Sequence, residues 1–405
     1  MNILCWPAIY ALELTPACNN HCIGCSNVYA SERVQPPMSA AAWVSLLDTF
    51  APEAVQIRLT GGEPTLHPEF LSILEAATSY DAVVTVFTNG RWRNPKLLVE
   101  QLHGQSNFSG LLVSLHGARS DSHEAFSRVP GSFDEATNNI RLAVDNGIMV
   151  ALSTIITHES WDEIEAVLEL GRRLGVQHIA FNRYIGQPLP EIEPTPSEIQ
   201  SAVTIIESLI RAGAPVKYGI GMPQCFESNS SEGCLAGVAY VSIDPWGNVR
   251  PCAHSPTIIG SLHQSSLPEL WCSAAMDAWR ALMPSDCVPC MAYTICHGGC
   301  RAVQELRSDR RDPLRGLARV DYSPIPRVRE LPADVRPHAV VRLRPESFGY
   351  SVLGRGHVLP VRTEAREVIE ACDGSATFAE LATRLDQSAV ELLGDLWEMG
   401  MLEVE

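Results

Sequence analysis

Three cysteines near the start of the chain have a spacing that could hold an iron–sulfur cluster. Cys18, Cys22 and Cys25 are separated by three and two residues, and they follow an apolar run that ends at Pro16. Cysteine thiolates are the usual protein ligands of such clusters, and three of them leave one iron of a cubane cluster free for a ligand from outside the chain. The alternative is a structural zinc site with a fourth ligand such as His21.

A second set of cysteines lies between residues 225 and 300, at short spacings typical of metal or cluster ligands. Its members are Cys225, Cys234, Cys252, Cys287, Cys290, Cys296 and Cys300. The segment Ile243–Cys252 contains Asp-Pro-Trp-Gly, which predicts a tight hairpin that ends at a cysteine. Two structural zinc sites are the alternative for this set. Cys5, Cys272 and Cys372 stand apart, and we expect them to be small buried side chains.

Two adjacent glycines precede a glutamate and a proline, in the order Gly61, Gly62, Glu63 and Pro64. Glycines let the backbone approach a ligand closely, and a carboxylate can accept hydrogen bonds from a cation. The four residues therefore form a candidate binding turn, although the same residues taken alone are a common structural turn.

The composition restricts the class of protein. The chain has 405 residues, enough for two or three domains, and its 46% hydrophobic and 19% charged residues are ordinary for a globular protein. Its net charge of −17 argues against general nucleic-acid binding, because contact with phosphates needs a basic surface. Neither a basic signal-peptide start nor an apolar run of about 20 residues is present, so we expect a cytoplasmic protein without a membrane span.

Short apolar runs alternate with amphipathic stretches from residue 9 to about 185, a pattern that predicts a parallel sheet. The predicted strands are Ile9–Thr15, Ala54–Thr60, Ala82–Thr88, Gly110–His116, Met149–Ile155 and Gln177–Asn182. Helices are expected between them, for example Ser39–Phe50 and Trp161–Leu174. Parallel barrels carry their chemistry at the carboxyl ends of the strands, so the first three cysteines and the glycine turn are expected at one end of the sheet.

The cysteine spacing, with Gly61–Pro64 one βα unit later, resembles the signature of radical S-adenosylmethionine (SAM) enzymes. The resemblance implies an α/β fold with a partial (β/α)6 TIM-like barrel over residues 1–190. It also implies a 4Fe–4S cluster on Cys18, Cys22 and Cys25 whose open iron binds SAM. The family usually has an aromatic residue where this chain has Gly24.

The same resemblance implies SAM contacts at the strand ends. The implied residues are Gly61, Gly62, Glu63, Pro64, Asn89, Ser114, His116, Arg128 and Ser153, with Asn182 as a further ribose candidate. The family usually has an aspartate in place of His116. Outside the glycine turn, a capping or turn-forming role is the alternative for each of these residues.

The later cysteines resemble the SPASM auxiliary-cluster domain, here placed at residues 191–306. The resemblance rests on Gly247-x4-Cys252 followed by Cys287-x2-Cys290-x5-Cys296-x3-Cys300. It implies one auxiliary 4Fe–4S cluster on Cys225, Cys234, Cys252 and Cys300, and a second on Cys287, Cys290 and Cys296. The second cluster would be completed by another ligand, with Glu305, Asp309 and Asp312 as candidates, or would stay open to a substrate.

The end of the chain has a different pattern. Residues 307–336 are rich in arginine and proline and predict a linker, and residues 337–405 contain three short predicted strands followed by three predicted helices. The segment Val368–Leu381 resembles the PqqD-like winged-helix fold, which serves as the recognition element in enzymes that modify ribosomally made peptides (RiPPs). The resemblance implies that this α+β domain binds the leader of a precursor peptide as an added strand. A DNA-binding winged helix is the alternative, but residues 338–405 contain six arginines, no lysine and twelve acidic residues.

These resemblances together predict a peptide-modifying radical SAM oxidoreductase. It would cleave SAM reductively to methionine and a 5′-deoxyadenosyl radical, which abstracts hydrogen from a precursor peptide bound through its leader. An auxiliary cluster would accept an electron, leaving an oxidative modification such as a C–C or C–S cross-link. The expected partners are the peptide and an electron donor such as flavodoxin or ferredoxin, with no nucleic acid and no membrane. No general base is predicted, because a turn-forming role explains Asp244, near the cluster hairpin, equally well.

Two other functions are alternatives. Oxidation of a protein Ser or Cys, as in anaerobic sulfatase maturases, would use the barrel and the clusters but leave residues 338–405 without a role. An iron–sulfur redox-sensing regulator would use the winged helix as its output, but it has no need for the glycine turn, and the acidic tail disfavours DNA.

Overall fold

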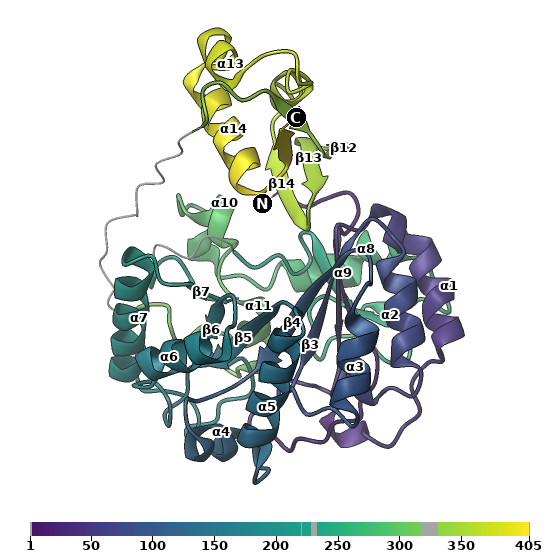
Figure 1. The fold of residues 1–405 in the computed structure, drawn as a ribbon, viewed down its shortest axis with the longest axis vertical. Coiled ribbons are helices and arrows are strands. Elements are labelled where there is room, and N and C mark those ends of the chain that lie inside the picture. Colours follow the sequence, from purple (N-terminus) through teal and green to yellow (C-terminus); the bar gives the residue numbers. More distant parts are fainter. Residues whose placement is uncertain (1, 220, 228–232, 318–330, 405) are drawn as a thin grey trace.

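A ten-stranded sheet forms the centre of the molecule (Figure 1). The computed structural model describes residues 2–219, 221–227, 233–317 and 331–404. The strand order is β10-β9-β8-β1-β2-β3-β4-β5-β6-β7, with parallel pairing from β8 to β7 and antiparallel pairing of β9 and β10. The strands are β1 (Ile9–Glu13), β2 (Gln56–Thr60), β3 (Val83–Thr88), β4 (Phe108–Ser114), β5 (Val150–Ile155), β6 (Ile179–Asn182), β7 (Val216–Tyr218), β8 (Tyr240–Ile243), β9 (Asn248–Arg250) and β10 (Gly260–Ser261). The predicted α/β class and open partial barrel are confirmed.

Helices cover the outer face of this sheet. They are α1 (Ala40–Phe50), α2 (Phe70–Thr78), α3 (Pro95–Leu102), α4 (Ser120–Ser127), α5 (Ser132–Asp145), α6 (Ile164–Leu174) and α7 (Pro196–Arg211). Ser39, the first residue of the helix expected over Ser39–Phe50, is the N-cap of α1 and accepts a hydrogen bond from the Ala42 N–H. Alternate strand residues such as Leu12, Leu59 and Val86 are fully buried in the core beneath the helices.

The strand residues that alternate with these buried ones face the inside of the curved sheet, because strand side chains alternate between its two faces. Two side-chain contacts across the sheet support this assignment, and one of them joins β2 and β8, which are not neighbours. The Arg58 guanidinium on β2 lies 5.7 Å from the Phe87 ring on β3 and 5.5 Å from the Tyr240 ring on β8. Arg58, Phe87 and Tyr240 are only partly buried, so the inner face of the barrel has space beside these side chains.

The sheet is larger than the six predicted strands. β7 pairs with β6, and the predicted hairpin around Ile243–Cys252 forms β8 and β9, of which β8 pairs in parallel with β1 from Ile9 to Leu12. Short helices follow this hairpin, namely α8 (Leu267–Trp271), α9 (Ala274–Arg280), α10 (Tyr293–Cys296) and α11 (Arg301–Leu306). The second cysteine set is therefore attached directly to the barrel through a shared sheet.

Five strands and three helices form the C-terminal module, where three strands and three helices were predicted. The elements are β11 (Pro337–Ala339), β12 (Arg342–Glu346), β13 (Gly349–Gly354), β14 (His357–Val361), α12 (Ala365–Glu370), α13 (Phe378–Arg384), α14 (Gln387–Glu398) and β15 (Leu402–Val404). The sequence pattern places the first of the three predicted strands at residues 338–344, but this stretch is split between two sheets. β11 pairs with β15, whereas β12 pairs with β13. Part of the predicted linker, residues 318–330, lies outside the described residues.

The module packs on the amino ends of the barrel strands, above the barrel in Figure 1. Leu353, Phe348 and Val358 form an apolar cluster with residues such as Leu4 and Val55. The contact also includes polar groups. Arg344 donates to the Trp6 carbonyl at 2.7 Å, Arg342 donates to the Pro52 carbonyl at 2.5 Å, and the Cys5 N–H donates to Glu346 at 2.6 Å.

Among the described residues, none of the helices has the length and apolar character needed to cross a membrane.

Candidate functional site

The first three cysteines lie on a loop at the carboxyl end of β1. Helix α4 holds one side of this loop, where the His21 and Ile23 N–H groups donate to the carbonyls of Ser127 and Phe126 at 3.0 and 2.9 Å. Two arginines hold the other side. Arg33 donates to the Asn20 carbonyl at 2.5 Å, and Arg91 donates to the Asn19 carbonyl at 2.7 Å. These charge-assisted bonds fix the backbone between the cysteines.

The three thiols lie close enough to affect one another. Burial, with added repulsion from the Cys25 and Cys18 thiolates, raises the pKa of Cys22 to about 12. Burial also raises the pKa of Cys18. Three mutually close thiols therefore need a cationic partner to exist together as thiolates, and an iron–sulfur cluster is such a partner.

The glycine turn is joined to the cysteine loop by backbone hydrogen bonds. The Gly62 and Glu63 N–H groups donate to the carbonyls of Thr15 and Ala17, both at 2.8 Å. A Cβ on Gly62 would lie 2.2 Å from the Ala17 carbonyl oxygen, and one on Gly61 would lie 2.7 Å from that of Thr15. The two motifs can pack this closely only because both positions are glycine.

Glu63 holds the turn against β3 from a fully buried position. Its carboxylate accepts from the Thr65 hydroxyl at 2.6 Å, the Thr88 hydroxyl at 2.8 Å and the Asn89 N–H at 2.7 Å. Burial raises the pKa of Glu63, and these donors oppose the shift. The Asn89 side chain continues to the cysteine loop, where it donates to Asn19 at 2.7 Å and lies 3.7 Å from the Cys18 sulfur.

Three other predicted residues lie on the inner face at the ends of β4, β5 and β6. Asn182 donates to the Ser153 hydroxyl at 3.1 Å, and Ser114 and Ser153 are paired in the sheet register. His116 is buried beside His123, and burial lowers its pKa to about 3. Its Nδ1 accepts from the Ile155 N–H at 3.3 Å, so the neutral ring carries its proton on Nε2.

Arg128 lies apart from this group in the described part of the chain. It is exposed, has a φ of +58° and ends helix α4, directly after the two carbonyls that hold the cysteine loop. Its contact with SAM stays a prediction, as do those of the other strand-end residues.

Sequence reasoning missed Arg33, Arg91 and Tyr184. Tyr184 explains why position 24, which has a φ of +57°, is a glycine. A Cβ there would lie 2.7 Å from the Tyr184 ring and 2.8 Å from Ile192. The ring from the β6 end thus occupies the space above the cysteine loop, and the absent aromatic residue at position 24 was the signal that could have pointed to it.

The later cysteines form two groups. In the first, which we call the inner group, burial together with the thiols of Cys234 and Cys300 raises the pKa of Cys252. Cys234 and Cys300 are 7% and 4% exposed, so the inner group is enclosed. Ile185, next to Tyr184, packs against Cys300, which places the segment after β6 between the inner group and the cysteine loop.

The second, or outer, group contains Cys225, Cys287, Cys290 and Cys296. Burial raises the pKa of Cys287, and the Cys296 and Cys225 thiols raise it further, while Cys290 bonds through its N–H to the Cys287 carbonyl at 3.1 Å. The sequence-based grouping placed Cys225 with the inner cysteines, and which cysteines share a cluster stays a prediction. The Pro223–Glu227 turn after β7 brings the Cys225 thiol to the side of Cys296 instead.

The three predicted extra ligands have different surroundings. Glu305 accepts from Ser255 at 2.6 Å and Trp279 at 2.9 Å and also from Thr257, and Asp309 is exposed. Asp312 is buried, is bound by Arg183 at 2.7 and 2.8 Å, and would lie 3.4 Å from a Cβ on Gly299, next to Cys300. Asp312 is therefore the candidate that lies between the two groups.

The hairpin that carries Cys252 is bound to β1 by a buried ion pair. Arg250 and Ser242 both contact the Glu13 carboxylate, and Arg250 is fully buried. Asp244 accepts from the Trp246 and Asn248 N–H groups at 2.8 and 2.9 Å, which is the turn-forming role considered for it.

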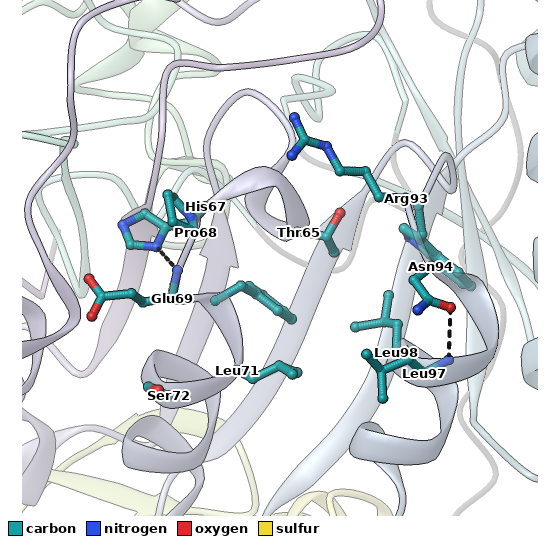
Figure 2. Close-up of a pocket in the computed structure, with 12 residues that line it drawn as sticks. Thr65, His67, Pro68, Glu69, Leu71, Ser72, Arg93, Asn94, Leu97 and Leu98 are labelled. Atoms are coloured by element: carbon teal, nitrogen blue, oxygen red, sulfur yellow. Dashed lines mark hydrogen bonds between the residues drawn. The ribbon is translucent and has the colours of Figure 1, made fainter.

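A cavity of about 420 Å³ lies behind this site, on the helix side of the sheet. Figure 2 shows its walls, which come from the segment Thr65–Ser72 and from the start of α3. It shares Thr65 with the Glu63 network, but none of the predicted site residues lines it. It is therefore separate from the candidate site.

Comparisons with known proteins agree with this geometry. Residues 12–171 match the radical SAM superfamily, and residues 234–300 match the iron–sulfur cluster-binding domain called SPASM. The AdoMet-dependent heme synthase of Methanosarcina barkeri is 24% identical over 73% of this chain and 91% of its own. The PqqA peptide cyclase of Rhizobium meliloti is 24% identical over 73% of this chain and 82% of its own.

A solved structure also has this fold. Streptococcus suis SuiB bound to its precursor peptide SuiA has a TM-score of 0.64 at 17% identity, over 77% of this chain and 76% of that one. The chain thus contains a radical SAM domain followed by a SPASM domain, and it is an enzyme that uses SAM and 4Fe–4S clusters. The three mutually close loop thiols, and the glycine turn that packs directly against their loop, fit these groups.

Proposed function

We propose that this protein is a cytoplasmic enzyme that modifies a ribosomally made precursor peptide by radical SAM chemistry. The observation that carries the proposal is the C-terminal module, which has a strand edge available for a peptide and is fixed to the barrel. The names of two similar proteins, PqqA peptide cyclase and SuiB with its precursor peptide, support a peptide substrate. We assign residues 1–190 to the barrel, 191–306 to the SPASM domain, 307–336 to a linker and 337–405 to peptide recognition.

Among the described residues, no strand pairs with the outer side of β14, which is therefore an open edge of the module. In the order β12-β13-β14, β12 contacts the barrel through Arg342 and Arg344, and β14 lies at the other edge. Gly354 and His357 close a two-residue turn and form a bonded pair, so Val358 and Pro360 direct their backbone groups away from β13. A leader strand would pair with the N–H and carbonyl of Val358 and with the carbonyl of Pro360.

The bound cofactors would supply the reductive cleavage of SAM and a hydrogen-abstracting radical, and an auxiliary cluster would accept an electron. The residues of the chain would bind and orient. Cys18, Cys22 and Cys25 would hold the SAM-binding cluster, the glycine turn and Asn89 would hold the methionine end of SAM, and Ser114, Ser153 and neutral His116 would hold its ribose. The side chains of Arg58, Phe87 and Tyr240 would line the space for the peptide.

The test is anaerobic reconstitution with SAM, a reductant and the short peptide encoded beside the gene. We expect 5′-deoxyadenosine and a change in peptide mass, with a Cys18→Ala, Cys22→Ala and Cys25→Ala triple variant as the inactive control. Absence of both products with the wild-type enzyme would falsify the proposal. For the module, a labelled leader should bind the full-length protein and resist competition by duplex DNA, and preferential DNA binding would contradict the assignment.

A further inference from the structure

The outer cysteine group lies on an unusually apolar part of the surface. Val288, Met291 and Ile295 are 61%, 97% and 51% exposed. They account for three of the eight exposed large apolar side chains found among the described residues, yet they fall within eight positions of the sequence. Single exposed apolar residues need no explanation, but a group of them marks a contact surface. We call these three residues the apolar ridge.

The ridge and the cysteines share one stretch of chain. The backbone turns tightly through this stretch, with the Cys290 N–H bound to Cys287, Tyr293 bound to Cys290 and Cys296 bound to Ala292. Cys290 is exposed, unlike the enclosed inner cysteines. A cluster on the outer group would therefore lie directly beneath the surface that the ridge forms.

Arginines lie beside the same stretch. Arg315 binds Asp286 at 2.6 Å, and together with the charge of Arg311 it lowers the pKa of that carboxyl. Asp286 is thus paired with Arg315, and Asp312 with Arg183. In the described part of this segment, two exposed arginines, Arg310 and Arg311, remain beside one exposed acidic residue, Asp309. The local charge is therefore positive. The chain as a whole has a net charge of −17.

We propose that the apolar ridge and Arg310–Arg311 form the docking surface for the electron donor, a small acidic one-electron carrier protein of the flavodoxin or ferredoxin class. The inference rests on the proposed function, which requires such a donor. The charge of the whole chain repels an acidic carrier, so a local basic patch is needed to steer and orient the encounter. Methionine and arginine are also enriched in protein interfaces.

The size of the surface fits this kind of partner. Complexes between electron carriers are transient and bury less than about 1,200 Å² in total, so a few apolar side chains with a charged rim are sufficient. At each encounter the reduced carrier would lose one electron to a cluster held by the cysteines of the outer group, with no bond made or broken. Cleavage of one SAM consumes one electron. The inner group and the Tyr184–Ile185 segment lie between the outer group and the cysteine loop.

The test reverses the charge of the rim. In the reconstituted holoenzyme, an Arg310→Glu and Arg311→Glu double variant should bind purified bacterial flavodoxin at least about tenfold more weakly in calorimetry, with a smaller salt dependence. The matched control is Arg172→Glu with Arg173→Glu, since these side chains on α6 are 57% and 60% exposed and undergo the same charge change. A second variant, Met291→Asp, should weaken binding without a change in the rim.

Activity driven by dithionite should be unchanged in all three variants, because a small reductant needs no docking surface. Equal loss of flavodoxin affinity in the α6 control, or no loss in the rim variant, would overturn the proposal. So would a change in oligomeric state caused by Met291→Asp, which would make the ridge a self-association surface. Loss of precursor-peptide binding in the rim variant would assign the surface to the substrate instead. A wild-type enzyme without dithionite-driven activity would disprove the proposed function while leaving the flavodoxin affinities to decide the docking surface.

Discussion

At the scale of single residues, the site depends on positions that have no side chain. Gly61 and Gly62 let the turn after β2 touch the cysteine loop, and Gly24 makes room for the Tyr184 ring. Gly186 accommodates the same ring, since a Cβ there would lie 2.1 Å from the Tyr184 hydroxyl oxygen. Such contacts explain why small changes near the cysteines should have large effects.

Gly62→Ala should disrupt the SAM-binding cluster. The new Cβ would meet the Ala17 carbonyl at 2.2 Å, and backbone cannot move aside as a flexible side chain can. We expect a lower iron content and a weaker signal of the SAM-bound reduced cluster in electron paramagnetic resonance. Gly213→Ala is the control, because nothing lies within 4 Å of its Cβ and it costs only about 1 kcal/mol for its positive φ. Equal iron content in the two variants would contradict the role of Gly62.

Tyr184→Ala should expose the cysteine loop to solvent, whereas Tyr184→Phe should resemble the wild type. The ring fills the space over Gly24, while within the described ranges of the chain the hydroxyl makes one bond, to the Gln187 carbonyl at 3.1 Å. We expect weaker SAM binding and faster loss of the cluster absorbance in air for the alanine variant alone. If the phenylalanine variant is equally affected, the hydroxyl rather than the ring is the important group.

At the scale of elements, one sheet joins the two cluster-binding regions. β8 continues the barrel sheet next to β1, and the fully buried Arg250 on β9 meets Glu13 on β1. The C-terminal end of the hairpin then leads to Cys252. The SPASM hairpin is therefore a structural part of the barrel.

Arg250→Met should destabilise the protein by about 3–5 kcal/mol, because it leaves the buried Glu13 carboxylate without a counter-charge. A second change, Glu13→Gln, should recover part of this loss, since it removes the stranded charge. The free energies of unfolding come from anaerobic urea titrations of the holoprotein. Arg173→Ala, which removes an exposed ion pair with Glu169, should cost less than about 1 kcal/mol. A similarly small loss in the free energy of unfolding for Arg250→Met would show that the ion pair between Arg250 and Glu13 contributes little to stability.

Local patterns predicted those features that depend on neighbours in the sequence. The cysteine spacing, the glycine turn, the six βα strands and the hairpin before Cys252 were all visible, because each is encoded within a few residues. Arg33, Arg91 and Tyr184 were missed because their contacts depend on how distant segments meet. The grouping of Cys225 and the splitting of the first C-terminal strand also depend on tertiary packing, which spacing alone does not determine.

At the scale of the whole molecule, the C-terminal module is docked and not simply tethered. Leu353 is 2% exposed and lies in a cluster with Leu4, Ala8 and Val55 at the amino ends of the barrel strands. The arginines of β12 surround this contact with bonds to barrel carbonyls. The position of the module relative to the barrel is thus defined by apolar burial.

Leu353→Asp should release the module from the barrel. Burial of the leucine contributes roughly 2–3 kcal/mol, and a buried carboxylate without a partner adds a further penalty. We expect a larger radius of gyration in small-angle scattering and loss of peptide modification, while SAM cleavage without peptide persists. Val404→Asp is the control, because Val404 is 48% exposed in the same module. An unchanged radius of gyration for Leu353→Asp would rule out this contact as the main attachment.

The module and the cysteine loop lie at opposite ends of the barrel, so under the proposed function this separation would set a minimum length for the peptide between its leader and the modified residue. Ile9 contacts the cluster around Leu353, and Thr15 contacts the glycine turn six residues further along. At about 3.3 Å per residue this is a height of roughly 20 Å, which an extended peptide covers with no fewer than about six residues. Precursor peptides with a shorter spacer between the leader and the modified residue should bind but remain unmodified, and lengthening the spacer should restore the reaction.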